Sequence, residues 1–221
     1  MDRYIEPEMS RCALITIDVQ QDTLDGQPFE IAGTTAALPT IRALLRAFRK
    51  TRRPIVHIVR IYLSDGSNVD LCRREMVEQG RGSFLADSPG CELAGELLPE
   101  AHTKLDTSLL LTGKVQRIGP EEFVVYKPRW GAFYQTHLDE LLRARNVSTL
   151  LFSGCNFPNC PRTSIYEASE RDYRIVLVED AISGLYDQGK REMAGIGVFV
   201  MSSSDVIREV NQCGSAITPH L

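Results

Sequence analysis

Six apolar runs of strand length, separated by segments with helical spacing, constrain the fold of this chain more than any other feature. The runs cover residues 12–19, 54–61, 122–126, 149–153, 174–178 and 198–201. Their hydrophobicity is nearly continuous, which indicates strands covered on both faces. Between them, apolar residues recur at helical spacing over 36–50, 134–145, 161–172 and 188–195. The alternation predicts an α/β fold of three layers, with helices on both faces of a mostly parallel six-stranded sheet.

Residues 64–120 interrupt this pattern with frequent Gly, Pro and Ser residues. Short helices are predicted at 69–79 and 92–97, but the apolar content of the segment is too low for a core of its own. We therefore expect one domain over residues 1–221, in which this segment is an excursion over the ends of the strands.

Composition and charge exclude several functional classes. The chain is 43% hydrophobic and 24% charged, with a net charge of −4, which argues against a nucleic-acid partner. The N-terminal stretch has acidic residues where a secretory signal needs a basic region, and no segment has the apolar length of a membrane span. These features predict a cytoplasmic protein with no membrane partner.

The cysteines and histidines give no metal-binding pattern. The six cysteines are scattered at positions 12, 72, 91, 155, 160 and 213, and the four histidines at 57, 102, 137 and 220. The chain is too long and too rich in core residues to resemble a disulfide scaffold, so we interpret the cysteines as free thiols. Because the spacing of zinc ligands is also missing, we predict no metal.

Three of the predicted strands end in residues capable of chemistry. Asp18 closes the run ALITID, Lys127 follows FVVY, and Cys155 and Cys160 follow TLLFSG. Ligands of open parallel sheets bind beyond the carboxyl ends of the strands, so these side chains could converge. Simpler readings stay open at this point: Asp18 as a turn cap, and Lys127 as a lysine that reaches solvent.

Cys160 stands at a predicted helix start, because proline, here Pro161, favours the first helical position. Unpaired amides and the helix dipole would then favour its thiolate, the nucleophilic form, with Arg162 and Lys127 adding to the effect. An inert buried cysteine is the alternative. Cys155, still within or beside the strand, fits that inert role better.

Together these residues resemble a known family. Asp18, Lys127 in YKPRWGAFYQTHLDELL and Cys160 in SGCNFPNCPRTSIYEASERDYRIVLVEDA are similar to the Asp, Lys and Cys motifs of the isochorismatase-like cysteine hydrolases, in their amidohydrolase branch. The resemblance covers residues 13–205. Family members commonly have Thr or Ser at the position of Phe157 and a small aliphatic residue at that of Pro161, so the pocket is expected to differ.

The resemblance implies a role for each site residue. Asp18 would be the general base, Lys127 would hold Asp18, and Cys160 would attack a carbonyl carbon. A cis peptide bond would join Cys155 to Asn156, so that the amides of Asn156 and Cys160 form an oxyanion hole. We also place Asp22, Trp130, Phe133 and Phe157 around the substrate, with ordinary packing as the alternative for each.

The implied reaction is hydrolysis of a C–N bond in a small non-peptide linear amide or ureido compound through a thioester. Nicotinamidase relatives bind a metal after the second strand, but HIVRIYLSDGSN has only His57 there, so no metal or other cofactor is expected. A homodimer or homotetramer is implied. The alternatives are a hydrolase that cleaves a vinyl ether and a non-catalytic binding protein; the stretch LLLTGKV lacks the first glycine of a phosphate-binding loop.

Overall fold

The computed structural model describes residues 2–214; residues 215–221, with His220, lie outside this part of the expected domain. Within it, seven strands form one sheet in the order β3-β4-β2-β1-β5-β6-β7. The strands are β1 (Cys12–Ile17), β2 (Ile55–Val59), β3 (Gln116–Gly119), β4 (Glu122–Tyr126), β5 (Thr149–Gly154), β6 (Arg174–Ile182) and β7 (Phe199–Met201). The helices are α1 (Thr34–Lys50), α2 (Arg74–Glu78), α3 (Thr107–Leu111), α4 (Leu138–Arg143), α5 (Cys160–Ser169), α6 (Asp187–Gly195) and α7 (Ser203–Gly214).

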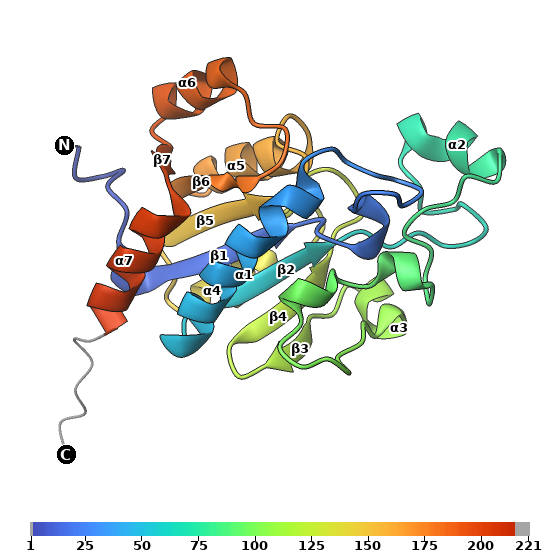
Figure 1. The fold of residues 1–221 in the computed structure, drawn as a ribbon, viewed down its shortest axis with the longest axis horizontal. Coiled ribbons are helices and arrows are strands. Elements are labelled where there is room, and N and C mark those ends of the chain that lie inside the picture. Colours follow the sequence, from blue (N-terminus) through green and yellow to red (C-terminus); the bar gives the residue numbers. More distant parts are fainter. Residues whose placement is uncertain (1, 215–221) are drawn as a thin grey trace.

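The sheet lies between two helical layers, as predicted. Helices α1 and α7 cover one face, and α4, α5 and α6 cover the other (Figure 1). Successive residues of β1 belong to different cores: Leu14 packs toward α1, whereas Ala13 and Ile15 pack toward α4 and α5. Because successive strand side chains point to opposite faces, a strand buried on both sides has the continuous apolar run seen in the sequence.

The expected count of six strands was one too low. The additional strand, β3, pairs antiparallel with β4 and has only partly buried or exposed residues. As a four-residue edge strand it has no continuous apolar run, so periodicity could not reveal it. The other neighbouring strands of the sheet, in the spatial order β4-β2-β1-β5-β6-β7, all pair in parallel.

The segment 64–120 lacks long regular elements. It contains α2, α3, β3 and 3-10 turns at Leu71–Arg73, Pro89–Cys91 and Gly95–Leu97, so the helices expected at 69–79 and 92–97 are shorter than predicted. α2 projects away from the sheet (Figure 1). Arg73 and Phe84, however, reach back to the carboxyl ends of the strands, where they line a cavity. The excursion thus supplies walls to the edge of the sheet where ligands bind in such folds.

Candidate active site

The backbone of the sheet brings three chain segments to one edge. The amide of Asp18 donates to Ile58 of β2 at 2.9 Å, and the amide of Lys127 donates to Val59 at 3.0 Å. The amide of Cys155 donates to Ile17 of β1 at 2.9 Å. Each segment is therefore fixed to its neighbour directly after the strand ends, so that the side chains that follow meet at one place.

Asp18, Lys127 and Cys160 form one buried cluster. Lys127 Nζ lies 2.9 Å from Asp18 Oδ2 and donates to Cys160 Sγ at 3.3 Å. Asp18 and Cys160 are 6% and 3% exposed, and Lys127 is fully buried. A buried ammonium or carboxylate is costly alone, so the two charges stabilise each other. The turn-cap reading of Asp18 and the solvent-exposed reading of Lys127 do not fit this geometry.

The charges around the cluster set the ionisation of Asp18 and Cys160. Burial alone would raise the pKa of Asp18, but the charges of Lys127 and Arg60 outweigh it and hold that pKa below its usual value. Burial raises the pKa of the Cys160 thiol, and the Asp18 carboxylate adds to the rise against Lys127 and Arg60. The helix start and the nearby cations therefore do not by themselves produce a thiolate: the site pairs a thiol with an ionised carboxylate.

The loop before α5 has the geometry that the resemblance implied. The Cys155–Asn156 peptide bond is cis, and Cys160 is the first residue of α5. In the described part of the chain, the N–H groups of Asn156 and Cys160 meet no protein acceptor. Gly154 has φ +111°, and a Cβ there would lie 2.2 Å from the carbonyl oxygen of Ile17, so only glycine fits. The loop therefore leaves two amides unpaired beside Cys160.

Cys155 lies next to Asp18. Its thiol donates to the main-chain carbonyl of Asp18 at 3.0 Å, and the residue is fully buried. Burial also raises its pKa well above the usual range. A buried, hydrogen-bonded thiol of this kind packs and positions the loop.

Arg60 is a site residue that the sequence analysis missed. It is 1% exposed and places Nη2 3.7 Å from Cys160 Sγ. Its charge is compensated by Asp70, whose Oδ2 lies 2.5 Å from Arg60 Nη1. Arg60 directly follows β2, so the strand-end argument that selected Asp18 and Lys127 could have selected it as well.

A narrow cavity opens beside the cluster and has about 20 Å³ of free volume, roughly the room for one water molecule. A larger ligand would have to displace side chains of its wall. It is lined by Asp18, Thr23, Phe29, Ile31, Arg60, Arg73, Phe84, Cys155, Asn156, Asn159 and Cys160. Six of these residues lie outside the Asp, Lys and Cys motifs: Thr23, Phe29 and Ile31 follow β1, Arg60 follows β2, and Arg73 and Phe84 belong to the segment 64–120.

The four residues expected around the substrate do not line this cavity. Phe133 packs against Tyr173 with ring centroids 5.9 Å apart, and Phe157 is fully buried against Tyr186. These two aromatic rings fill the core, as the packing alternative holds. Asp22 Oδ2 accepts from the amide of Phe84 at 2.6 Å, and Trp130 packs behind the cavity wall. Both therefore support lining residues instead of facing a ligand.

His57 lies inside β2 and turns away from the cluster. Its Nδ1 lies 2.8 Å from Thr16 Oγ1, and its Nε2 lies 2.8 Å from Glu122 Oε1. Within residues 2–214, no three His, Cys, Asp or Glu side chains are grouped so that they could hold a metal ion. The same residues contain no helix with the length and apolar character needed to cross a membrane.

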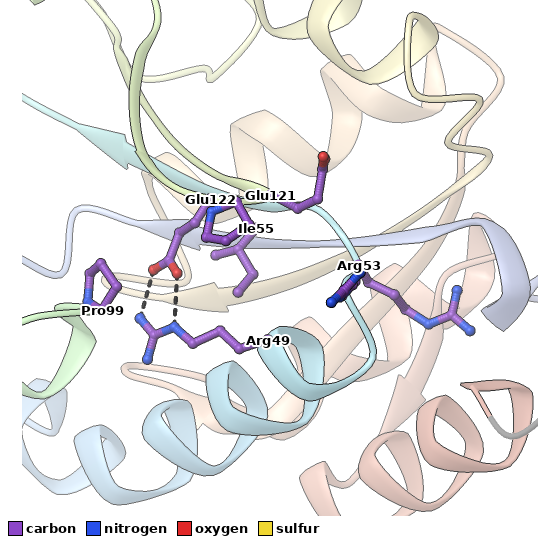
Figure 2. Close-up of a pocket in the computed structure, with 8 residues that line it drawn as sticks. Arg49, Arg53, Ile55, Pro99, Glu121 and Glu122 are labelled. Atoms are coloured by element: carbon purple, nitrogen blue, oxygen red, sulfur yellow. Dashed lines mark hydrogen bonds and ion pairs between the residues drawn. The ribbon is translucent and has the colours of Figure 1, made fainter.

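A second pocket lies at the opposite end of the strands. Figure 2 shows Arg49, from the last turn of α1, directed at Glu122, the first residue of β4. The guanidinium contacts both carboxylate oxygens, at 2.8 and 2.6 Å. Arg53 lines the same pocket but donates to the carbonyl of Ser10. Since Arg49 and Glu122 already pair with each other, this pocket is best explained as structural.

Comparison with known proteins identifies the family. The isochorismatase domain model matches residues 12–205. The structure superposes with an isochorismatase family protein of Desulfovibrio vulgaris at a TM-score of 0.76 and 30% identity, covering 91% of this chain and 98% of that one. Ureidoacrylate amidohydrolase RutB of Methylobacterium radiotolerans is 29% identical over 87% of this chain and 76% of its own length. A "probable inactive nicotinamidase" of Arabidopsis thaliana is 23% identical over 84% of this chain and 89% of its own. The chain therefore belongs to the isochorismatase-like cysteine hydrolase family.

Proposed function

We propose that the chain is a cysteine-dependent amidohydrolase that cleaves a C–N bond of a small non-peptide linear amide or ureido compound. The observation that carries the proposal is the position of Lys127 Nζ, which contacts both the Asp18 carboxylate and the Cys160 sulfur. A base, a cation and a nucleophile beside a cavity form the arrangement needed for covalent catalysis at a carbonyl carbon. The similarity to ureidoacrylate amidohydrolases supports the same bond type.

In the first step, Asp18 removes the proton of the Cys160 thiol as the sulfur adds to the substrate carbonyl. The lowered pKa of Asp18 and the raised pKa of Cys160 make this transfer uphill at rest. The ammonium of Lys127 lies against the sulfur and compensates the charge that develops there. The thiolate is thus generated only as it reacts, so between turnovers the cysteine stays in the less reactive thiol form.

The carbonyl oxygen, now negative, accepts hydrogen bonds from the amides of Asn156 and Cys160. Each such donor is typically worth about 10²- to 10³-fold in rate. Protonated Asp18 then gives its proton to the leaving nitrogen, so the C–N bond breaks and a thioester to Cys160 remains. Asp18, ionised again, activates a water that hydrolyses the thioester and regenerates the thiol.

Two alternatives compete with this proposal. A vinyl-ether-cleaving hydrolase of this fold would not need a nucleophile, and the cluster around Cys160 argues against it. A non-catalytic binding protein is the second, because the Arabidopsis relative carries the name of an inactive enzyme. Ammonia release separates the amidohydrolase from both alternatives.

The test measures ammonia release from a panel of linear amides, carbamoyl amines and ureido acids, for wild type and Cys160→Ala. We expect turnover of at least one compound by the wild type and a loss of about 10³-fold or more in the variant, since the covalent step is then impossible. Mass spectrometry of quenched wild-type reactions should show an acyl adduct on the peptide with Cys160. Equal rates in the two proteins, or no turnover of any compound, would overturn the proposal.

A further inference from the structure

Two cations touch the sulfur of Cys160. Lys127 Nζ donates to Sγ at 3.3 Å, and Arg60 Nη2 donates to it at 3.7 Å. Both cations also donate to a second shared acceptor, the main-chain carbonyl of Arg129, at 3.2 and 3.0 Å. The sulfur and this carbonyl therefore each bridge the ammonium and the guanidinium, so both cations are held against Cys160 in spite of their like charges.

Each of these cations has a buried carboxylate of its own. Lys127 Nζ lies 2.9 Å from Asp18 Oδ2, and Arg60 Nη1 lies 2.5 Å from Asp70 Oδ2. Burial alone would lower the pKa of Arg60, but the charge of Asp18 and of its other neighbours raises that pKa above its usual value. The guanidinium therefore stays charged, and the cluster holds two positive and two negative charges while Cys160 is a thiol.

Transfer of the thiol proton moves one negative charge from Asp18 to Cys160. Lys127 contacts both groups, so it has an anionic partner before and after the transfer. Arg60 differs, because its N–H reaches the sulfur, whereas no hydrogen bond or ion pair joins it to Asp18 in the described structure. A hydrogen bond from a cation is strongest when its acceptor is charged. The contact of Arg60 is thus stronger in the reacting state than at rest.

Asp70 fixes the direction of this guanidinium. It belongs to the segment 64–120, and its Oδ2 accepts from Arg60 Nη1 at 2.5 Å and from the Tyr62 hydroxyl at 2.6 Å. Nη1 also donates to Tyr62 at 3.3 Å. Since the guanidinium is a rigid planar fork, holding Nη1 at this pair directs Nη2 at the sulfur of Cys160.

Arg73, the other guanidinium of the cavity wall, is held less firmly. Its Nη1 donates to Tyr62 at 2.9 Å but stays 3.6 Å from Asp70 Oδ2. Its outer edge, Nε and Nη2, meets no acceptor among the described residues. Of the two guanidinium groups that line the cavity, Arg60 is therefore the one that is both fixed and in contact with the nucleophile.

We propose that Arg60 is a second cationic catalytic residue of this site, which stabilises the developing thiolate of Cys160, and that Asp70 is its positioning residue. The inference rests on the proposed function, because it adds residues to the same covalent step. As Asp18 takes the thiol proton, the S–H bond breaks and its electron pair stays on the sulfur, to which Arg60 and Lys127 both donate. The segment 64–120 thus sets the reactivity of the nucleophile as well as supplying a cavity wall.

The first test reads the ionisation of Cys160 without any turnover. Protein labelled with carbon-13 at the cysteine Cβ atoms is titrated by NMR, and the Cys160 signal is assigned by its absence in Cys160→Ala. The other ionisable groups around the sulfur, Asp18, Lys127 and the thiol of Cys155, stay in place. We expect the midpoint in Arg60→Met to rise by at least about one pH unit, the usual effect of losing an opposite charge in contact. Arg60→Lys keeps the charge without the fork, so its rise should be smaller.

The second test measures ammonia release on any compound that the wild type turns over. We expect kcat/KM of Arg60→Met to fall about tenfold or more, because weaker stabilisation of the thiolate raises the barrier of the covalent step. Since the contact strengthens only in the reacting state, kcat should fall in parallel. Arg53→Met is the matched control: Arg53 is also buried, at 7% exposure, but does not line the cavity. Its variant should keep the wild-type midpoint of Cys160 and the wild-type kcat/KM.

Two further variants allow for the stability of the fold and test Asp70. Arg60→Met/Asp70→Asn removes both charges, so no unpaired ion is left in the interior. Its Cys160 midpoint should still rise, because Arg60 contacts the sulfur and Asp70 lies behind it. In Asp70→Asn, loss of the negative charge alone would lower the midpoint, whereas loss of the position of Arg60 would raise it. We expect the rise, together with a lower kcat/KM.

The outcomes separate this inference from the proposed function. An unchanged Cys160 midpoint in Arg60→Met and in the double variant would overturn the inference, since Arg60 would then act only through packing. A raised midpoint with an unchanged kcat/KM would also overturn it. A fall of the midpoint in Asp70→Asn would overturn the positioning role of Asp70. A raised midpoint in the Arg60 variants, with no turnover of any compound by the wild type, would support the action of Arg60 on the thiol and overturn the hydrolase.

Discussion

The two ends of the sheet each bury a carboxylate against a basic side chain, but the two carboxylates are satisfied differently. At the amino end, both oxygens of Glu122 are bound by Arg49, and one is also bound by His57. At the carboxyl end, Asp18 Oδ2 contacts Lys127, whereas its Oδ1 is buried without a hydrogen-bond partner in the described structure. Buried polar atoms are normally paired, so this oxygen beside the cavity still has the capacity to accept a hydrogen bond or a proton.

The electrostatics follow the same division. Burial opposes the charge of Glu122, yet its bonds with Arg49 and His57 lower its pKa to about 2. All groups of that network bond to one another and support the fold. At the other end, the charges of Asp18, Lys127 and Arg60 act on the thiol of Cys160. The comparison therefore predicts that charge removal costs stability at both ends, but activity only at the carboxyl end.

The largest effect is expected from Asp18→Asn. Because the amide cannot accept the thiol proton, kcat/KM in ammonia release should fall about 10²- to 10⁴-fold. The fully buried ammonium of Lys127 loses its carboxylate partner, although it keeps the carbonyl of Arg129 at 3.2 Å. The free energy of unfolding should therefore fall as well, by about 3–5 kcal/mol. Urea denaturation measures this second quantity. Full activity of Asp18→Asn would contradict the catalytic role assigned to the carboxyl end of the sheet.

Glu122→Gln should lower stability without lowering activity. It leaves Arg49 and His57 without their carboxylate, and breaking a buried ion pair typically costs about 3–5 kcal/mol. We expect the free energy of unfolding at pH 7 to fall by roughly 3 kcal/mol, while kcat/KM of the folded enzyme at 25 °C stays within about threefold of wild type. A large loss of activity in the fully folded variant would show that the two ends are coupled.

The acid sensitivity of the fold should originate partly at Glu122. Its pKa is about 2 in the folded chain against an ordinary 4.5, so its stabilising effect is present above pH 4.5 and is lost as the pH falls toward 2. Its protonation over this pH range should lower the free energy of unfolding by roughly 3 kcal/mol. In urea titrations at several pH values, the free energy of unfolding should fall less on acidification in Glu122→Gln than in wild type.

The smallest effect is expected from Cys155→Ser. Serine keeps a donor for the carbonyl of Asp18, so kcat/KM should fall less than about tenfold. Peptide mapping after treatment with iodoacetamide and a ureido substrate should show substrate protection of Cys160 in both proteins. Loss of that protection in Cys155→Ser would indicate that Cys155 takes a direct part in the reaction. It would contradict the assignment of Cys155 as a positioning residue.

The sequence by itself determined the order of six strands and of the main helices between them, because strands covered on both faces need continuous apolar runs and helices need spaced ones. It did not reveal α3 or the C-terminal helix α7. It also identified Asp18, Lys127 and Cys160, since strand ends in a parallel sheet share one edge. Only the tertiary structure decided the pairing of Arg60 with Asp70, the unpaired edge of Arg73 and the strand β3. It likewise placed Phe133 and Phe157 in the core. Hydrophobic periodicity shows on which face of its own helix or strand a side chain lies. Ion pairs and cavity walls depend instead on which distant segments of the chain meet.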